Sequence, residues 1–316
     1  MEEEKLPKAK TISIRFDKDY LKGNSFNPRI NLDHILKIQN KKLSKTLNEN
    51  LEDHLVIYDE GLKLIISIHE LCKSHLLQKN YASSFVVLSA KMVSLMLGIR
   101  QMIHSGLSDC MKNLNRPLIE SFDTFQACLI NQELNNAFSN TNEMYDNNDF
   151  FWKNFAKGKL NKECNKLYEK LEIEKDIIKY IEERKKLIKS YLSESIHSSF
   201  NAAFSSYLMM TIDFNISSDI YGKITTGFPR LLISLIEEIS IFNTIFKLSL
   251  DKNISKDFLG IENQPTYKNY EFYQNKYGAL CEIFLEKLEN DFIEMSNQIN
   301  EIKNQIKEEF EEKNNA

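Results

Sequence analysis

Glycine and proline are scarce in this chain of 316 residues, which contains only 9 Gly and 5 Pro. Sandwiches, barrels and Gly-rich nucleotide-binding folds need frequent turns, so this scarcity argues against all three classes. The sequence also has no P-loop, no GxGxxG and no GxSxG motif. It therefore favours long helices over tightly turned β structure.

Cysteine is sparse too, and the five thiols are widely spaced: Cys72, Cys110, Cys128, Cys164 and Cys281. Their number is odd and no CxxC pair occurs, so we expect neither a disulfide framework nor a structural zinc site. Reduced, mostly buried thiols are typical of cytosolic proteins, and Cys128 fits a core position better than a nucleophile. The N-terminus is acidic and has no apolar run of the kind found in signal peptides. We therefore predict a cytoplasmic protein.

No metal-binding motif stands out. His69, Cys72 and His75 lie in one predicted helix, but Lys73 occupies the position where an HExxH motif needs its second histidine. Cys72 can share a helix face with either histidine, whereas all three side chains do not converge well. We expect neither a metal site nor a cofactor.

Charge of one sign is not in large excess, because 41 Lys and Arg stand against 45 Asp and Glu for a formal charge of −4. This balance provides no overall attraction for nucleic acid, so binding of DNA or RNA is not indicated by charge. Hydrophobic residues make up 42% and charged residues 27%, which is ordinary for a globular protein and excludes wholesale disorder.

Two apolar stretches are long enough to test as membrane spans, and both contain charge. The stretch from Ser83 to Ile99 includes Lys91, and the stretch 231–250 carries Glu237 and Glu238 near its middle. A charge at the centre of a bilayer costs about 3 kcal/mol on insertion scales. We therefore interpret both stretches as helices of a protein core and expect no membrane association.

The chain reads as one helical domain that follows a short arm. Residues 1–31 form the arm, in which Thr11–Phe16 alternates with period two and predicts a strand or extended segment. Residues 32–312 form the domain. Apolar periodicity predicts helices over about 32–47, 50–78, 80–104, 107–135, 160–172, 174–210, 229–250 and 269–312. The predicted fold is all-α, a bundle of eight to ten helices with a long C-terminal helix.

Pro117 stands inside the helix predicted over 107–135. Proline removes a helical hydrogen bond and clashes with the preceding turn. The helix therefore either kinks at Pro117 or starts anew there, with Asn115 as its N-cap and Pro117 in its first turn.

Three polar or aromatic stretches carry further expectations. The Asn-rich segment 135–149 predicts a loop or a frayed helix end, and the following Phe150–Trp152 predicts a plug in the core. The basic run Arg184–Lys186 comes directly after two glutamates and predicts a solvated helix face.

The last predicted helix carries a heptad seam with alternating spacings of three and four residues: Leu285, Leu288, Phe292, Met295, Ile299, Ile302 and Ile306. The seam predicts either a long helix packed along its own protein or a coiled coil between copies or with a partner. Acidic residues outnumber basic ones in this helix, so a parallel pair in close register is disfavoured. We expect Ile299, Ile302 and Ile306 to be buried against another helix.

Two pairs of polar residues recur at the spacing that places side chains on one helix face. Arg116 and Glu120 are four residues apart, and so are Ser193 and His197 in a later helix. An exposed Arg–Glu pair at this spacing is worth about 0.3–0.5 kcal/mol. If the pairs meet between helices, Arg supplies a permanent cation for phosphate and His can move a proton.

The segment from Gly106 to Glu120, with Asn115-Arg116-Pro117 in it, and the later Leu192–His197 resemble a family of uncharacterised all-helical bacterial proteins. In that family a turn leads into a helix that bears RxxxE, and a later helix bears SxxxH. The resemblance covers about residues 80–205. It implies that Arg116, Glu120, Ser193 and His197 meet in space, and it implies no activity.

Arg100 and His104 form an arginine–histidine pair of a kind that is also found in another helical family. Arg100 and His104 lie at the end of one predicted helix, but their spacing is shorter than that of the Arg–His motif in HEPN-type helical ribonucleases. We therefore interpret them as a polar helix end and do not assign that family.

Two functions of different classes follow from these patterns. The first is a helical interaction or effector protein of bacterial defence or stress, which acts through a protein partner or as a homo-oligomer formed by the C-terminal helix. The second is a helical-bundle nuclease or phosphate-handling enzyme, with Arg116, Glu120, His197 and Ser193 as the catalytic residues. A convergence of these side chains at an open cleft would favour the second function.

Overall fold

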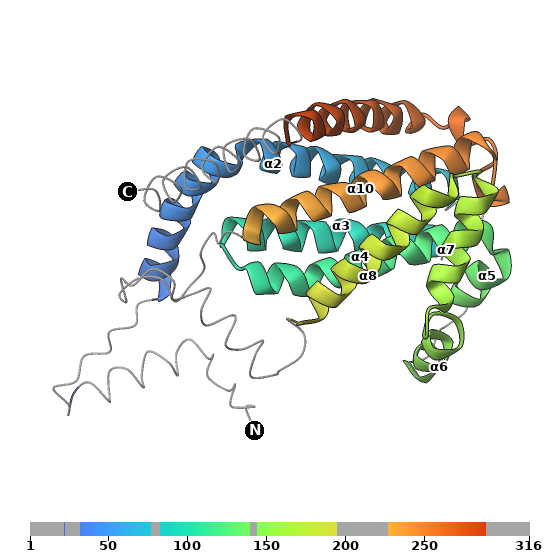
Figure 1. Cartoon of the computed structure of the whole chain (residues 1–316), viewed down its shortest axis with the longest axis horizontal. Helices are drawn as coiled ribbons and strands as arrows, with labels where there is room; N and C mark the ends of the chain where they lie inside the picture. Colours follow the sequence, from blue (N-terminus) through green and yellow to red (C-terminus); the bar gives the residue numbers. More distant parts are fainter. Residues whose placement is uncertain (1–21, 23–31, 77–82, 140–143, 195–226, 289–316) are drawn as a thin grey trace, which may run out of the picture.

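The computed structural model of the chain describes residues 22, 32–76, 83–139, 144–194 and 227–288. These residues form a bundle of α-helices with two short 3-10 turns, and no strand occurs among them, which confirms the predicted all-α fold (Figure 1). The helices are α2 (Leu32–Leu76), α3 (Ser84–His104), α4 (Ser108–Ile130), α5 (Gln132–Ser139), α6 (Met144–Asn154), α7 (Lys159–Lys170), α8 (Lys175–Glu194) and α10 (Gly227–Asp251). The turns η1 (Lys256–Phe258) and η2 (Ile261–Asn263) lead to a last described helix over 267–288. The arm predicted over 1–31, with its strand, lies outside the described residues except for Lys22.

The first long helix bends at one residue. Leu51 has φ −134° and ψ 17°, which is outside the helical region, so α2 consists of two helices joined at this point. The sequence predicted two helices that meet near residues 47–50, and the structure places the junction there. Leu51, the residue at the bend, is buried in the core with only 3% exposure.

Phenylalanine side chains fill the centre of the bundle. Around them, α3 packs against α2 and α4, and α10 packs against the same two helices (Figure 1). Their ring centroids lie 4.5–6.4 Å apart in mostly edge-to-face pairs, a favourable arrangement for aromatic rings. The cluster consists of Phe85, Phe122, Phe125, Phe242, Phe246 and Phe258. It ties η1 to the helices and fixes the face of α4 that carries Phe122 and Phe125, so the polar groups described below lie on the other side of this helix.

Helix α4 continues through Pro117. It begins at Ser108, after Leu107 as N-cap, so the prediction that a new helix starts at Asn115 is wrong. Ser121 donates its hydroxyl hydrogen to the Pro117 carbonyl at 2.6 Å, a back-bond that often accompanies helix bending. Helix α4 therefore accommodates the proline within its interior.

The segment 135–149, predicted as a loop or a frayed helix end, is largely helical. Helices α5 and α6 cover most of 135–149, because their apolar side chains find partners: Phe150 packs edge-to-face against Phe138 and Phe155, with centroids 5.8 and 5.1 Å away. The predicted aromatic plug is wrong for the next two residues. Phe151 is 45% and Trp152 is 58% exposed.

The two apolar stretches form α3 and α10, and both contribute to the core. Among the described helices, α3 alone is long and apolar enough to cross a membrane by length and composition. It buries residues that include Phe85, Met92, Met96 and Ile99 against its neighbours.

The last described helix packs through a face that differs from the predicted seam. Tyr270, Tyr277, Cys281 and Phe284 are buried, and Tyr277 donates a hydrogen bond to the Ile236 carbonyl of α10 at 2.8 Å. Leu285, the first residue of the seam, is 48% exposed. Leu288 packs against the core, and the seam from Phe292 onwards, with Ile299, Ile302 and Ile306, lies outside the described residues.

Candidate functional site

The RxxxE helix and the SxxxH helix meet at one corner of the bundle. Arg116 of α4 donates from Nε to Glu120 Oε1 at 3.2 Å and from Nη1 to Ser193 Oγ of α8 at 2.6 Å. Ser193 in turn donates to the Lys189 carbonyl one turn earlier. Three of the four predicted site residues therefore lie together, and the fourth, His197, lies outside the described residues.

This corner is open to water. The side chain of Arg116 is 34% exposed and that of Glu120 is 40% exposed, so their pairing is that of a partly solvated helix pair. Ser193 and Glu120 both accept hydrogen bonds from the guanidinium of Arg116. The arrangement joins α4 to α8, and a catalytic role for the four residues stays a prediction.

A second polar cluster lies one turn further along α4 and is deeply buried. Asp123 Oδ1 accepts a hydrogen bond from Lys185 Nζ at 2.5 Å, and Oδ2 accepts one from Lys189 Nζ at 2.8 Å. Lys185 also donates to the Tyr168 hydroxyl at 2.9 Å, and Tyr168 donates to Gln126 at 2.7 Å. These bonds connect α4, α7 and α8.

The first residue of the basic run, Arg184, reaches a different helix. Arg184 pairs with both Glu237 and Glu238 of α10, and its Nη2 donates to the Ser234 carbonyl at 2.9 Å. Arg184 has a side-chain exposure of 9% and Glu238 one of 2%. The expected solvated face at Arg184–Lys186 is therefore wrong for its first two residues, because each has a buried carboxylate partner, whereas Lys186 is exposed.

Opposite charges favour the ionised forms of Asp123 and Lys185, whereas burial shifts Glu238 towards its neutral form. Burial alone would raise the pKa of Asp123, but the charges of Lys185 and Lys189 outweigh it and lower that pKa below its usual value. Burial alone would lower the pKa of Lys185, and the charge of Asp123 reverses this, so the pKa of Lys185 is raised. In Glu238 burial dominates over the charge of Arg184, and its pKa is raised.

Arg100 and His69, which the sequence also singled out, have structural partners. Arg100 forms a two-pronged ion pair with Asp59, at 2.8 and 3.0 Å, as expected for a polar helix end. His69 Nδ1 lies 3.0 Å from Ser89 Oγ, and no group of metal-ligating side chains occurs among the described residues.

The thiol of Cys128 is buried in the core, as the sequence predicted, and burial raises its pKa to about 12. A thiol with so high a pKa is almost wholly protonated at neutral pH and is a poor nucleophile.

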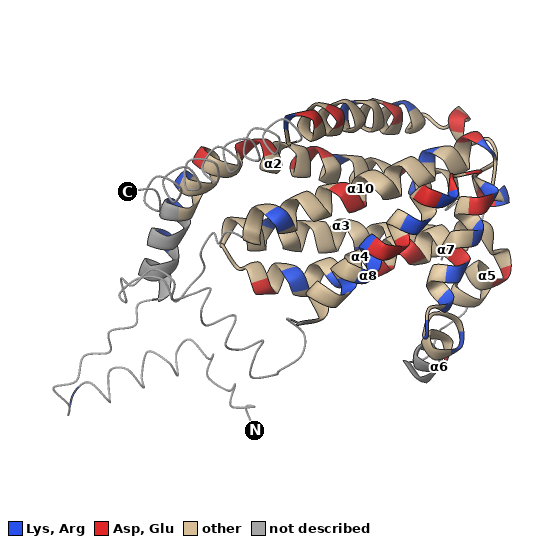
Figure 2. Ribbon diagram, in the orientation of Figure 1, with Lys and Arg blue, Asp and Glu red and all other residues tan. Residues whose placement is uncertain are grey.

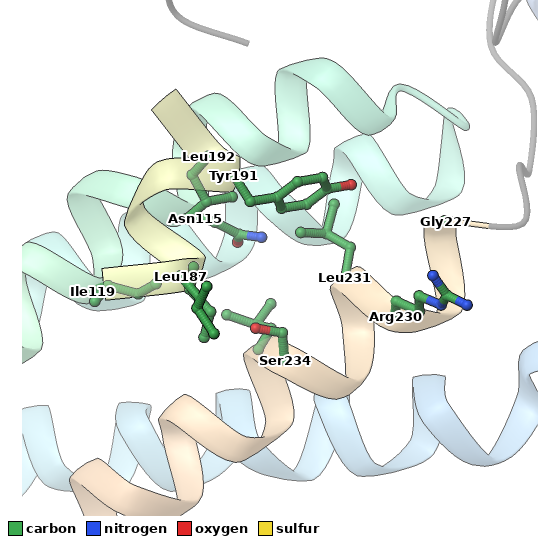
Figure 3. Close-up of a pocket in the computed structure, with 11 residues that line it drawn as sticks. Asn115, Ile119, Leu187, Tyr191, Leu192, Gly227, Arg230, Leu231 and Ser234 are labelled. Carbon is green, nitrogen blue, oxygen red and sulfur yellow. The ribbon is translucent and has the colours of Figure 1, made fainter. Parts of the chain in front are cut away.

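A pocket of about 550 Å³ opens between α4, α8 and α10 (Figure 3). Its lining includes Asn115 and Leu192, the residues directly before Arg116 and Ser193 in the sequence. Its walls are mostly apolar, and its polar groups are the amide of Asn115, the hydroxyl groups of Tyr191 and Ser234, and the guanidinium of Arg230. Asn115 precedes Arg116 on α4, so the pocket and the open corner share one turn of helix. The sequence singled out Asn115 only as an N-cap and did not predict the pocket.

Comparisons with known proteins found no relative that would assign a role to this site. No protein-family model matches the chain, and neither a curated protein nor a solved structure is significantly similar to it. The resemblance over residues 80–205 to helical bacterial proteins therefore stays a prediction that rests on the two motifs.

Proposed function

We propose that this protein is a helical interaction protein of a bacterial defence or stress response, and that it acts by binding a protein partner. The observation that carries the proposal is the exposed aromatic pair Phe151–Trp152 at the end of α6. The two rings lie 6.0 Å apart and are 45% and 58% exposed. Tryptophan and phenylalanine are enriched in interface cores, where large side chains fill pockets of a partner.

The structure around this pair is suited to presenting it. Phe150 and Phe155 turn inwards and contact Phe138 of α5, which anchors the helix while the next two aromatic rings remain outside. Exposed lysines, Lys153 and Lys157, flank the pair. A partner with an apolar pocket bordered by carboxylates would complement this surface, because opposite charges at a rim favour association.

The buried ion pairs support binding in preference to catalysis. Lys185, Asp123, Arg184 and Glu238 are each engaged by opposite charges inside the bundle, where they connect α8 to α4 and α10. These four buried charges are thus paired with one another, in the manner of structural ion pairs. Figure 2 shows basic and acidic segments along α8 where it crosses the bundle.

The test uses Trp152, the only tryptophan of the chain, as both target and reporter. Affinity-tagged protein is recovered from its native cells beside the variants Trp152→Ser and Leu259→Ser, the latter altering an equally exposed residue, at 50%, away from α6. We expect one protein to co-purify with the wild type and with Leu259→Ser and to be lost with Trp152→Ser. The purified partner should shift the Trp152 emission to shorter wavelength. Equal recovery with all three proteins would contradict the proposal.

The C-terminal helix offers a second surface for self-association. Ile283 and Leu285 are 65% and 48% exposed at the point where the heptad seam begins. If the heptad seam holds copies of the chain together, Ile302→Asp should dissociate the oligomer, and sedimentation experiments would detect the change. An unchanged sedimentation coefficient and melting temperature would show that the seam has no such role.

The alternative function, a helical nuclease or phosphate-handling enzyme, draws support from the Arg116–Ser193 contact, which joins its two motifs. If His197 is catalytic, His197→Ala should abolish nuclease activity or toxicity in cells and leave the melting temperature nearly unchanged. Full activity of this variant would rule out the role.

A further inference from the structure

The pocket between α4, α8 and α10 has the size and composition of a ligand site. Its volume of about 550 Å³ lies within the range of about 300–1,000 Å³ that small-molecule pockets occupy. Ile119, Leu231 and Leu235 provide apolar walls, and Leu187 and Tyr191 at its edge are 72% and 40% exposed. An apolar molecule that entered would bury surface against these side chains.

One polar group inside this pocket has no protein partner. Asn115 is only 2% exposed, and its Oδ1 accepts no hydrogen bond in the part of the chain that the structure describes. Its carboxamide points into the space between Tyr191 and Ser234 (Figure 3). A buried amide oxygen without a donor is destabilising, so its presence here points to a hydrogen-bond donor supplied by a bound molecule. The oxygen accepts, which suits a hydroxyl or an amide N–H of the ligand.

The rim of the pocket is positively charged. Arg230 lies exposed at the start of α10, and it forms no ion pair among the described residues. Lys112 lies over the Tyr191 ring, 4.6 Å from its centroid, but it also pairs with Asp109 at 3.4 Å, so Arg230 supplies the uncompensated positive charge of the rim. The acidic residues nearby are already engaged, since Glu120 pairs with Arg116 and Glu237 pairs with Arg184. The charge at the mouth of the pocket therefore favours an anion.

We propose that this pocket binds a small anionic amphiphile, whose acid group pairs with Arg230 and whose apolar body lies against Ile119, Leu231 and Leu235. A hydroxyl or amide group in that body would reach the carboxamide of Asn115. A carboxylate fits the guanidinium of Arg230 in a two-pronged hydrogen bond. This inference does not depend on a protein partner or on the aromatic pair of α6.

Isothermal titration with three probes below their micellar concentrations tests the proposal: dodecanoate, dodecanol and ω-hydroxydodecanoate. We expect saturable binding with a stoichiometry of one, tighter for the two acids than for dodecanol. Arg230→Glu should weaken binding of dodecanoate by about tenfold or more, as loss of a charged hydrogen bond implies, and should leave dodecanol unaffected. Lys268→Glu alters an exposed lysine on the last described helix, away from the pocket, and serves as the matched control.

Two further variants locate the ligand. We expect the wild type to bind ω-hydroxydodecanoate more tightly than dodecanoate, because the added hydroxyl donates to Asn115. Asn115→Leu keeps the branched shape of the side chain and removes the amide, so it should retain dodecanoate and lose this preference. Ser234→Trp places a large side chain in the pocket and should abolish binding of all three probes, while circular dichroism verifies the fold. The proposal is overturned if dodecanoate shows no saturable binding, if Arg230→Glu binds as Lys268→Glu does, or if Ser234→Trp binds like the wild type. An unchanged probe preference in Asn115→Leu would overturn the role of Asn115.

Discussion

Lys185 of α8 donates a hydrogen bond of 2.5 Å to Asp123 of α4, and solvent reaches only 6% of the one side chain and 1% of the other. Two opposite charges withdrawn from water in this way depend on each other. Their attraction offsets the loss of hydration only as long as both are present. The pair therefore makes the fold sensitive to a change at either residue, and the first two predictions rest on it.

Replacing Asp123 with alanine should cost about 3–5 kcal/mol of unfolding free energy, because it leaves Lys185 buried without its counter-charge. Urea denaturation of the wild type and the variant measures the difference. The double variant Asp123→Leu with Lys185→Met removes both charges and keeps similar volume, so it should recover most of the loss. A single variant as stable as the wild type would show that the pair contributes nothing to folding.

Acid should weaken the fold through the same carboxylate. The pKa of Asp123 is lowered in the folded state, chiefly because two lysine charges outweigh the effect of burial. A lowered folded pKa stabilises the protein above the unfolded pKa of about 3.9, and this stabilisation is lost as the pH falls through the folded pKa. Relative to the double variant Asp123→Leu, Lys185→Met, which lacks this carboxylate, the wild type should therefore lose stability as the pH falls below about 4. A difference independent of pH would contradict this assignment.

Arg116 and Arg184 should respond differently to the same substitution. The Arg116–Glu120 pair is partly solvated, so Arg116→Ala should cost less than about 1 kcal/mol. Arg184→Ala should cost about 3–5 kcal/mol, because it leaves Glu238, with a side-chain exposure of 2%, without its partner. Thermal or chemical denaturation compares the two. A large loss at Arg116 would mean that the corner of α4 and α8 is a structural element of the core.

Two helical glycines should respond in opposite directions to alanine. A Cβ at Gly61 of α2 would lie 2.9 Å from Tyr277 Cε2, and the tyrosine is fixed by its burial and its hydrogen bond to Ile236. Gly61→Ala should therefore destabilise by about 1–3 kcal/mol. Gly278 has open space around it and lies in the helix over 267–288, so Gly278→Ala should stabilise by about 0.5–1 kcal/mol. Equal effects would contradict the close packing of the two helices.

Local sequence patterns were sufficient to predict most of the helices. The apolar periodicity located α3 and α10, and the break near residue 47 anticipated the bend of α2 at Leu51. Composition misled at 135–149, where asparagines predict a loop. There the tertiary contact between Phe138 and Phe150 outweighs the weak helix propensity of Asn. Phe150, Phe151 and Trp152 were expected to plug the core, yet only Phe150 packs inwards, whereas Phe151 and Trp152 are exposed.

The buried charges could not be predicted in the same way. Arg184 and Lys185 have a charge pattern that is usual for a solvated face, and their partners Glu238 and Asp123 lie 54 and 62 residues away in the sequence. Only the packing of α8 across α4 and α10 brings these groups together. The contact of Arg116 with Ser193, 77 residues apart, was expected from the two motifs. The pocket beside it depends on the shapes of three helices and has no sequence signal of its own.

The adjacent positions of Arg184 and Lys185 have a consequence for how α8 can be placed. Neighbouring residues on a helix project about 100° apart, and here one reaches α10 while the other reaches α4. A purely apolar helix could slide by one turn or rotate about its axis and still bury leucine against leucine. Any such displacement of α8 would leave at least one buried charge without its counter-charge. These two residues therefore select a single angular setting of the helix among many that hydrophobic contact alone would allow.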